Sequence, residues 1–393
     1  MGSSSIHGAI CLLFLLAAVA EAQWHVWNVK KYGAKGDGQS DISQAMMSAW
    51  KEACASPSPA AVVIPPGNYM AGPVKFIGPC KAPMMVQVQG VVKAPADPNK
   101  FKQDGWVVFQ YVDHLTVSGG GTFDGQGTTT WSKYSCGRTG KCPVLPINLR
   151  FDFVTNSVIR DIHSLNSKSF HVNVMGCKNV TFQHLTITAP ENSPNTDGIH
   201  MGRATGINIT DVKIGTGDDC ISIGPGSRSV TINKVTCGPG HGISVGSLGR
   251  YQNEEDVVGI NVRNCTLTNT MNGVRIKTWP ASPNGFASDM HFDNIIMNKV
   301  SNPILIDQEY CPWNQCKQQV PSRVKISQVS FRNIRGTSAT QLAVKLVCSK
   351  GMPCQNVEVG NINLQYIGKE GPVTSHCANV KPILTGKQIP AIV

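Results

Sequence analysis

Apolar and polar residues alternate in many short stretches along the chain, and these stretches fall into two families. Each stretch of the first family opens with a polar residue, followed by a small residue, a branched aliphatic residue and a second polar residue. Its members are Asp197-Gly-Ile-His, Asp219-Cys-Ile-Ser, His241-Gly-Ile-Ser and Asn272-Gly-Val-Arg, at spacings of 22, 22 and 31 residues. Alternation with period two predicts strands with one buried face.

The second family is rich in β-branched residues, which suit the pleated surface of a sheet. Its members, at spacings of 22 to 34 residues, are Val158-Ile-Arg, Val180-Thr-Phe, Ile207-Asn-Ile, Val230-Thr-Ile, Ile260-Asn-Val, Met290-His-Phe, Val324-Lys-Ile and Val357-Glu-Val. Segments that repeat every 20–50 residues or so indicate stacked structural units. Two or more strands per turn, without helices between them, predict an all-β fold, a right-handed parallel β-helix. The alternative is a β-sandwich, which rarely carries eight repeats in register.

One helix is predicted near the start of the chain. Apolar residues recur there at helical spacing, and Asp41 precedes them as a candidate N-cap. The stripe consists of Ile42, Ala45, Met46, Ala49, Trp50 and Ala53. Because a stacked core needs its open end covered, we expect this helix to cap the N-terminal end of the coil. No linker or charge run divides the rest, so we expect a single domain over residues 23–393.

The first 22 residues have the features of a secretory signal peptide. The apolar run from Ala9 to Ala20 is too short to span a bilayer, and Ala20-Glu-Ala matches a cleavage site of small residues. The mature chain then begins at Gln23. No later segment is apolar enough for a membrane anchor, so we expect a secreted protein that acts without a membrane.

Cysteine usage agrees with export. Of 14 cysteines, 13 remain after the signal peptide, and an exported chain should form disulfides and leave at least one thiol unpaired. The close pairs are Cys136/Cys142, Cys220/Cys237, Cys311/Cys316 and Cys348/Cys354, although connectivity stays open at this stage. Their spacing does not match a zinc site, and no metal or cofactor is expected. Three glycosylation acceptors begin at Asn179, Asn208 and Asn264.

The chain is basic, with a formal net charge of +11 that becomes +12 once the signal peptide and its Glu21 are removed. A basic secreted protein favours a polyanion as its partner. An acidic polysaccharide fits the compartment better than nucleic acid, for which the chain has no recognisable module. The alternative is a basic surface that is simply solvated.

Stacking of the first family would gather three carboxylates and an imidazole. In a coil, Asp197, Asp219 and His241 would lie in one row about 4.8 Å apart, with Asp218 beside them. The outward positions that follow are His200, Ser222, Ser244 and Arg275, and then Gly202, Gly224, Gly246 and Lys277. Crowded carboxylates raise the pKa of at least one of them. A turn in which the aspartates cap backbone amides is the alternative for Asp218 and Asp219.

Two carboxyl groups, one protonated and one ionised, are the minimum equipment for hydrolysis of a glycosidic bond. Small outward residues beside the acid row leave room for a sugar. Arg275 and Lys277 alternate onto the same face, and there they could bind a substrate carboxylate, although such a pair is often a solvated strand face.

Four motifs carry a resemblance to a known family. Asn195-Thr-Asp, Gly217-Asp-Asp, Gly240-His-Gly and Arg275-Ile-Lys occur in the order that is typical of polygalacturonases, the pectin-degrading glycoside hydrolases of the parallel β-helix class. Three further stretches resemble the plant pollen-type exopolygalacturonases; they are Gly119-Gly-Gly-Thr-Phe-Asp-Gly-Gln-Gly, Leu149-Arg-Phe-Asp-Phe-Val-Thr-Asn and Ile306-Asp-Gln-Glu-Tyr.

The resemblance implies a role for each matched position. Asp218 matches the general acid, Asp197 and Asp219 match the pair that activates water, and His241 matches the residue that tunes the acid. Arg275, Lys277 and Tyr310 match substrate-binding residues, and Asn195 matches the motif with a binding role.

The resemblance implies a metal-independent, monomeric, inverting hydrolase of α-1,4-galacturonosyl bonds in demethylated pectin, which acts in the cell wall. The resemblance to the pollen-type enzymes further implies exo action. The alternatives are endo action, a pectin lyase, which the acid row argues against, and a non-catalytic pectin-binding wall protein.

Overall fold

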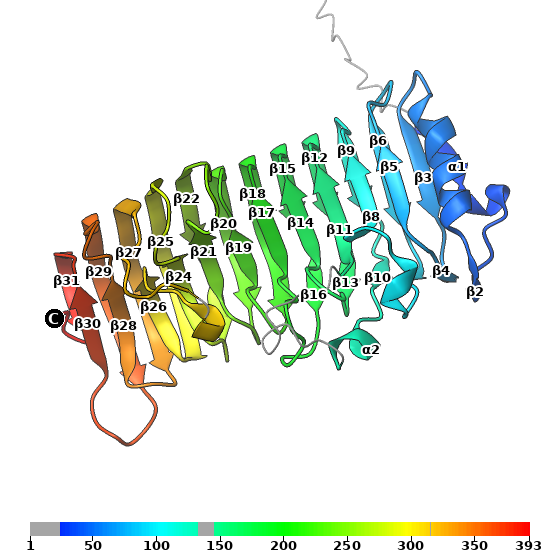
Figure 1. The fold of residues 1–393 in the computed structure, drawn as a ribbon. Helices are drawn as coiled ribbons and strands as arrows, with labels where there is room; N and C mark the ends of the chain where they lie inside the picture. Colours follow the sequence, from blue (N-terminus) through cyan, green and yellow to red (C-terminus); the bar gives the residue numbers. More distant parts are fainter. Residues whose placement is uncertain (1–23, 133–144, 315) are drawn as a thin grey trace, which may run out of the picture.

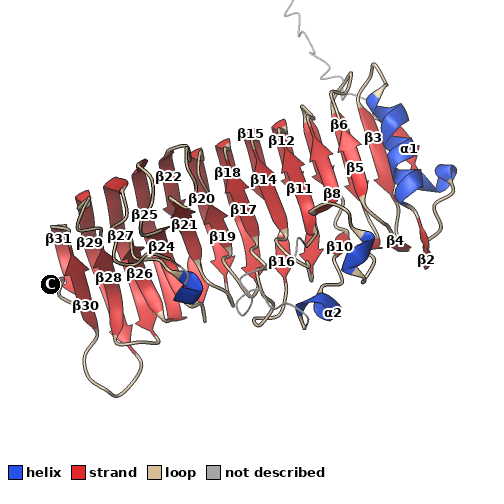
Figure 2. Ribbon diagram, in the orientation of Figure 1, coloured by secondary structure: helices blue, strands red, loops and turns tan. Residues whose placement is uncertain are grey.

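The computed structural model describes residues 24–132, 145–314 and 316–393, and it shows one long coil of parallel strands (Figures 1 and 2). Every pairing between the strands is parallel, and the pairings form a 20-stranded and an 11-stranded sheet. The predicted right-handed parallel β-helix is therefore confirmed. Three ladders of stacked strands run along the coil, and we call them ladders A, B and C.

Ladder A forms one side of the larger sheet. It contains β1 (His25–Asn28), β3 (Ala60–Ile64), β6 (Met84–Val88), β9 (Leu115–Ser118), β12 (Thr155–Arg160), β15 (Lys178–Gln183), β18 (Thr205–Gly215), β20 (Arg228–Cys237), β22 (Val257–Arg263), β25 (Gly285–Val300), β27 (Val324–Ser338), β29 (Gln355–Tyr366) and β31 (Ile383–Ile389). The longer strands among these turn a corner and continue into ladder B, which joins both ladders into one sheet.

Ladder B is completed by short strands that pair with the corresponding strands of the neighbouring turns. They are β2 (Asp37–Asp41), β4 (Asn68–Met70), β7 (Val91–Lys93), β10 (Thr122–Asp124), β13 (His163–Leu165), β16 (Thr186–Thr188) and β23 (Thr266–Thr268).

Ladder C is the separate 11-stranded sheet. Its strands are β5 (Val74–Ile77), β8 (Gly105–Gln110), β11 (Ile147–Asp152), β14 (Val172–Met175), β17 (Ile199–Gly202), β19 (Ile221–Ile223), β21 (Ile243–Leu248), β24 (Asn272–Thr278), β26 (Asn302–Asp307), β28 (Leu342–Val347) and β30 (Thr374–Ala378).

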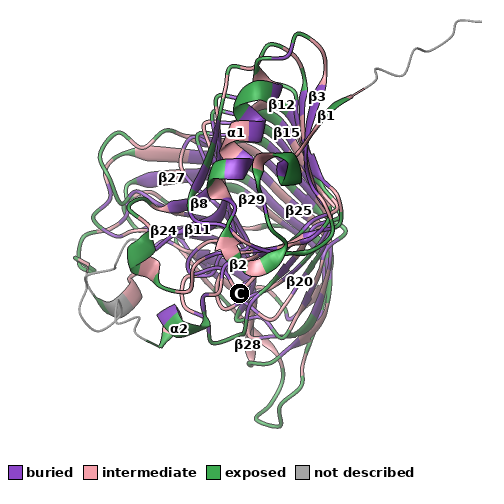
Figure 3. Ribbon diagram, turned by 90° about the vertical axis from the view of Figure 1, so that its right-hand side faces the viewer, coloured by how far each residue is buried: buried purple, intermediate pink, exposed green. Residues whose placement is uncertain are grey.

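The core fills the space between the three ladders (Figure 3). Inward side chains of neighbouring turns lie directly above one another, because the strands are parallel and in register. Phe76, Phe109 and Phe151 illustrate this stacking, with ring centroids 5.0 and 5.2 Å apart along ladder C. Each turn therefore buries apolar surface only against its two neighbours.

Helix α1 (Ser43–Cys54) closes the N-terminal end of the coil, as the sequence predicts (Figure 1). All six residues of its apolar stripe are buried, and Trp50 packs on Phe76 with ring centroids 4.8 Å apart. Asp41 caps the helix from one position further back than the N-cap. Its carboxylate accepts a hydrogen bond from the backbone N–H of Ser43 and another from that of Gly72. The remaining helices of the described residues are α2 (Thr128–Trp131) and three short 3₁₀ turns, at Val29–Tyr32, Pro98–Lys100 and Pro312–Asn314.

Two members of the second family are out of register with the rest. Val158 lies opposite Thr181 rather than Val180, so Ser157 and Ile159 face the core in its place. Val324 pairs with Gly285, and the true counterpart of Met290 is Val329, five residues further along β27. Since a slip of one residue turns every side chain to the opposite face, the burial of Ile159 decides the first case.

At the corner between ladders A and B, one residue per turn adopts a left-handed conformation. We call these residues the corner column; they are Asp161, His184, Asp211, Lys234, Asn264, Asn294, Asn333 and Asn361, with φ between 51° and 56°. Asparagine side chains bridge successive turns there. Asn264 donates to the side chain of Asn233 at 2.8 Å, and Asn294 donates to that of Asn264 at 2.7 Å.

Four disulfides are present among the described residues. Three match the predicted pairs, Cys220–Cys237, Cys311–Cys316 and Cys348–Cys354, and the fourth, Cys54–Cys80, joins the end of α1 to the loop after β5. The expected pair Cys136/Cys142 lies outside the described residues. Within them, Cys177, Cys265 and Cys377 are free thiols. Disulfides in this number are consistent with an extracellular protein.

The expected signal peptide, residues 1–22, also lies outside the described residues. Across the part of the chain that the structure describes, no helix has the length and apolar character needed to cross a bilayer.

Candidate active site

The acid row forms where the chain enters ladder C. Asp197, Asp219 and His241 each stand two residues before the first residue of β17, β19 and β21, and those strands pair in the predicted register. Gly217 makes the close turn before Asp218 possible. A side chain at this position would place its Cβ 2.0 Å from the carbonyl oxygen of Ser193. The repeat thus brings the predicted acids together on the outer face of the coil.

Asp219 is an ionised carboxylate that is almost fully buried among cations. One of its oxygens accepts hydrogen bonds from Ser244 Oγ at 2.9 Å and Arg275 Nη2 at 2.8 Å, and the other accepts one from Lys277 Nζ at 2.7 Å. Burial alone would raise the pKa of Asp219, but the charges of Lys277 and Arg275 outweigh it and lower that pKa to about 2. Asp219 therefore keeps its negative charge at any physiological pH.

Asp197 lies on the neighbouring turn and is also buried, but no cation contacts it among the described residues. Its carboxyl group accepts a hydrogen bond from Ser222 Oγ at 2.6 Å, and Ser222 in turn contacts His200 Nδ1 at 2.8 Å. Burial, followed by the charges of Asp218 and Asp219, raises the pKa of Asp197 well above its usual value. The crowding that the sequence predicts therefore adds to the raised pKa of Asp197, but burial is the larger cause.

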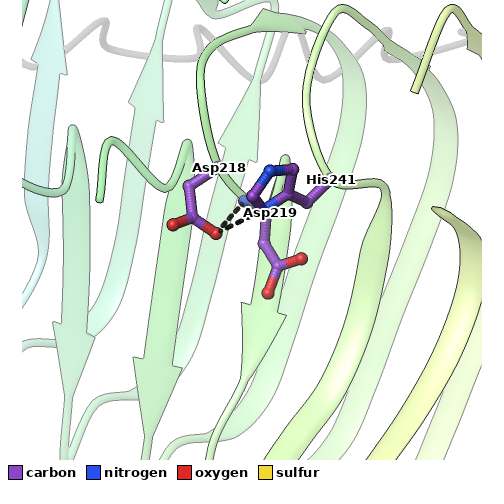
Figure 4. Close-up of side chains that lie close together, drawn as sticks. All are labelled: Asp218, Asp219 and His241. Carbon is purple, nitrogen blue, oxygen red and sulfur yellow. Dashed lines mark hydrogen bonds and ion pairs between the residues drawn. The ribbon is translucent and has the colours of Figure 1, made fainter. Parts of the chain in front are cut away.

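Asp218 is the accessible member of the three, with 27% of its side chain exposed. Its Oδ1 contacts His241 Nδ1 at 3.1 Å and accepts a hydrogen bond from the backbone N–H of Asp219 at 2.8 Å (Figure 4). His241 is similarly exposed, at 31%. The pair forms the solvent-facing edge of the acid cluster.

Two cavities meet at this edge. One has a volume of about 430 Å³ and reaches Asp197 and Asp219, and the other has a volume of about 440 Å³ and reaches His241 and Arg275. Their shared lining consists of Asn195, Asp218, Lys277, Tyr310 and Pro312. All eight residues that the sequence singles out therefore line one or both cavities, and Asp218 lies at their junction.

The two predicted substrate cations have partners within the protein. Arg275 and Lys277 both bind Asp219, and both lie against the ring of Tyr310, at 5.8 and 5.2 Å from its centroid. Since two positive charges share one carboxylate, the group formed by Arg275, Lys277 and Asp219 carries one net positive charge. Asn195, in a left-handed conformation, is held by a hydrogen bond from its amide to Ser169 Oγ at 3.4 Å.

The register also explains the hydroxyl groups that bind the acids. His200, Ser222, Ser244 and Arg275 form one outward row, as predicted. The second row, from Gly202 to Lys277, is interrupted by an irregularity between Val245 and Leu248. Gly246 has φ +108° there, and a Cβ would lie 2.3 Å from the Lys277 carbonyl oxygen, so the row cannot continue regularly.

The walls of the cavity that reaches Asp197 and Asp219 contain residues that the sequence analysis missed. Trp279, Arg250 and Tyr251 come from the segments that leave ladder C after β21 and β24. These segments do not repeat, so no periodic signal marks them. A simple signal was available nonetheless, because aromatic and cationic residues directly follow two strands of the site.

The cluster Asp218, Asp219 and His241 offers three possible metal ligands within 4.8 Å of one another. A metal would have to displace Arg275 and Lys277, which occupy both oxygens of Asp219. The residues present therefore fit an ion-pair network better than a metal centre.

Neighbouring carboxyl groups whose pKa values are shifted in opposite directions, beside cavities that can hold a sugar, are typical of enzymes that hydrolyse glycosidic bonds. The comparison with known families agrees. The model of glycosyl hydrolases family 28 matches residues 54–388, and this chain belongs to that family.

The relatives cover nearly the whole chain. An exopolygalacturonase from Platanus acerifolia is 60% identical over 93% of this chain and 97% of its own length, and one from Oenothera organensis is 58% identical over 90% and 98%. Among solved structures, an endo-xylogalacturonan hydrolase from Aspergillus tubingensis superposes with a TM-score of 0.76, covering 93% of this chain and 100% of its own. At 22% identity, this last likeness concerns the fold.

Proposed function

We propose that this protein is a secreted hydrolase that cleaves α-1,4-galacturonosyl bonds of demethylated pectin, with inversion and from a chain end. The observation that carries the proposal is the position of Asp218 at the junction of two cavities, above the buried pair Asp197 and Asp219. The two sugars joined by the scissile bond can occupy one cavity each. The glycosidic oxygen between them then faces Asp218.

Asp218 acts as the general acid in this proposal. It is the accessible carboxyl group, and His241 Nδ1 contacts its Oδ1 at 3.1 Å. A protonated Asp218 delivers its proton to the leaving oxygen, and His241 adjusts how readily that proton is held.

Asp219 and Asp197 hold and activate the attacking water. Asp219 is ionised, because Lys277 and Arg275 stabilise its charge. Asp197 holds a proton more readily, because burial penalises its charge. A water placed between a charged and a more weakly acidic carboxyl group can be oriented by one and can lose a proton to the other. Attack from the face opposite the leaving oxygen inverts the anomeric carbon.

The cations beside Asp219 can bind an anionic sugar. Arg275 and Lys277 carry two positive charges against the one charge of Asp219, and Tyr310 offers a ring face beside them. A galacturonate carboxylate can bind these cations while its sugar ring packs on the tyrosine. The basic net charge of the whole chain attracts the same polyanion at longer range.

Exo action is supported by the relatives. The proteins from Platanus acerifolia and Oenothera organensis, at 60% and 58% identity, are both named exopolygalacturonase. We further propose that residues 23–393 form a single-domain monomer that acts in the cell wall, after removal of the signal peptide. The disulfides and the basic charge are consistent with that location.

Product analysis on polygalacturonate tests the proposal. We expect new reducing ends, monogalacturonate from the first minutes and a slow loss of viscosity. Mixed oligomers with fast loss of viscosity would instead establish endo action. An absence of new reducing ends with retained binding would indicate a wall-binding protein, and a product that absorbs in the ultraviolet would indicate a lyase.

A further inference from the structure

A third cation faces the cavity that reaches Asp197 and Asp219, from the outer wall of that cavity. Arg250 lies in the segment between β21 and β22, and its guanidinium carbon lies 5.1 Å from the ring of Trp279 and 5.4 Å from that of Tyr251. Among the described residues, no carboxylate lies within ion-pair distance of this guanidinium. Arg250 thus keeps a full positive charge at the mouth of the cavity.

Arg250 differs from the other two cations in burial and in hydrogen-bond partners. Arg275 and Lys277 are nearly buried, and each donates a hydrogen bond to Asp219. Part of their binding capacity is therefore already used. Arg250 is exposed, and its contacts are with aromatic faces, which leave the N–H groups at the edge of the guanidinium plane free to bind an anion.

The surrounding residues hold Arg250 in place. The carboxylate of Glu254 accepts hydrogen bonds from the backbone N–H groups of Gly249, Arg250 and Tyr251, at 2.6, 2.9 and 2.8 Å. Trp279 is fixed by a hydrogen bond from its Nε1 to Ser247 Oγ at 2.9 Å. Both the segment that carries Arg250 and the ring beneath it are therefore ordered before any ligand arrives, which lowers the entropic cost of binding.

A continuous wall connects Arg250 to the acid cluster. Trp279 lies edge-on to Tyr310, with ring centroids 5.7 Å apart, and Tyr310 contacts Lys277. Two adjoining aromatic rings therefore lie between the cations Arg250 and Lys277 along this side of the cavity. This arrangement suits a chain of sugars that each carry one carboxylate. The sugar rings can pack on the aromatic rings, and the carboxylates can bind the cations.

We propose that Arg250 binds the carboxylate of a second uronate unit, one that occupies the cavity reaching Asp197 and Asp219, away from the galacturonate held by Arg275 and Lys277. The inference rests on the proposed function for the identity of the sugar. Arg250 is then a specificity-determining residue, which makes binding depend on two neighbouring free carboxylates rather than on one.

Replacement of Arg250 tests this role against a matched control. Arg250→Gln removes the charge, and Arg250→Lys keeps the charge but loses the planar, two-pronged donor. Arg263→Gln is the control, since Arg263 is an exposed arginine of β22 on the 20-stranded sheet, without a carboxylate partner among the described residues. Initial rates on polygalacturonate give KM and kcat, and calorimetry with trigalacturonate on the Asp218→Asn background gives Kd.

We expect Arg250→Gln to raise KM and Kd about tenfold, as the loss of a charge-assisted hydrogen bond does. The change in kcat should stay within about twofold. Arg250→Lys should recover part of the affinity, and Arg263→Gln should match the wild type. Equal KM and Kd for Arg250→Gln and Arg263→Gln would overturn the inference, as would a loss confined to kcat.

The two proposals fail in different ways. If the wild-type protein releases no reducing ends from polygalacturonate, the proposed function is wrong, whatever Arg250 does. If it does release them and Arg250→Gln binds trigalacturonate as tightly as the control, only the role of Arg250 is wrong. Melting temperatures of all variants, compared with the wild type, exclude a folding defect as the cause of weaker binding.

Discussion

The acid row and the corner column are two polar stacks built by the same repeat, on different sides of the coil. In the corner column, Asn264 and Asn294 carry neutral amides that stack with Asn233 beside the column, and such an asparagine can donate to one neighbour and accept from the next. In the acid row, Asp197 and Asp219 can only accept hydrogen bonds when they are ionised. Stacking one on the other therefore supplies neither carboxylate with a hydrogen-bond donor. Register places a residue above its neighbour, but the chemistry of the side chains decides whether the stack sustains itself.

The acid row is completed from outside its own column, and unequally. Asp219 has two cations and a serine hydroxyl, whereas Asp197 has one serine hydroxyl. As a result, the pKa of Asp219 is lowered to about 2, and the pKa of Asp197 is raised. Two carboxyl groups on adjacent turns thereby acquire opposite protonation preferences, which a stack of neutral amides such as Asn264 and Asn294 has no means to produce.

The largest expected effect is on turnover in Asp218→Asn. Loss of a general acid typically costs about 10²–10⁴-fold in rate. The partly exposed side chain contributes little to packing, so the melting temperature should stay within about 2 °C of the wild type. Reducing-end assays and thermal unfolding, measured on the same preparation, check both expectations. A rate close to that of the wild type would remove Asp218 from the mechanism.

Asp219→Asn should strongly reduce stability. The neutral amide leaves Arg275 and Lys277 nearly buried without a counter-charge, and breaking such a buried pair typically costs about 3–5 kcal/mol. Urea denaturation at pH 7 measures the change. Arg160→Gln is a suitable control, because its ion pair with Asp161 in the corner column is exposed and should contribute less than about 1 kcal/mol.

Asp197→Asn should act on stability in the opposite direction. A carboxyl group whose pKa is higher in the folded state binds its proton more tightly there, so its contribution is favourable at low pH and is lost as the pH rises through the folded pKa. At pH 7 the substitution removes an unfavourable buried charge, and we expect the melting temperature to rise by about 1–3 °C while activity is lost.

The pH dependence of unfolding provides the control for that prediction. At pH 4, near the pKa of an unfolded aspartate, the melting temperatures of Asp197→Asn and the wild type should converge. A variant that is less stable than the wild type at pH 7 would contradict the raised pKa of Asp197.

The smallest effect belongs to the corner column. Asn264→Ala removes one hydrogen bond to Asn233 and one from Asn294, each about 2.7–2.8 Å long, and should cost about 1 kcal/mol. Asn208→Ala is the matched control, because this substitution also removes a glycosylation acceptor. The side chain of Asn208 makes no hydrogen bond within the described residues. Equal stabilities of the two variants, measured by urea denaturation, would show that the stacked amides contribute nothing.

The sequence predicts those features that follow the repeat. A fixed spacing of 22 residues places Asp197, Asp219 and His241 in one row and turns Ser222 and Ser244 outward, and the structure agrees at each position. The interpretation of Val158 is wrong because a period of two does not specify the phase by itself; either of two adjacent residues satisfies the pattern.

Features outside the repeat could not be predicted in the same way. Cys54 and Cys80 are brought together by the fold of α1 over the first turns, and no local spacing marks that pair. Trp279 and Arg250 reach the cavity from segments of individual length, so their meeting depends on loop shape. The unequal pKa values of Asp197 and Asp219 likewise depend on which turn supplies Arg275 and Lys277.

The groups that carry the acid chemistry and those that shape the cavity enter from opposite ends of the ladder C strands. Asp197, Asp218, Asp219 and His241 precede these strands, whereas Arg250, Trp279 and Tyr310 follow them. Insertions and deletions in the segments after β21, β24 and β26 leave the spacing of the acids unchanged, because these segments follow His241 in the chain. Over evolutionary time, such a scaffold can therefore vary the sugar chains it accepts by lengthening or shortening loops, while selection holds the residue count before each acid constant.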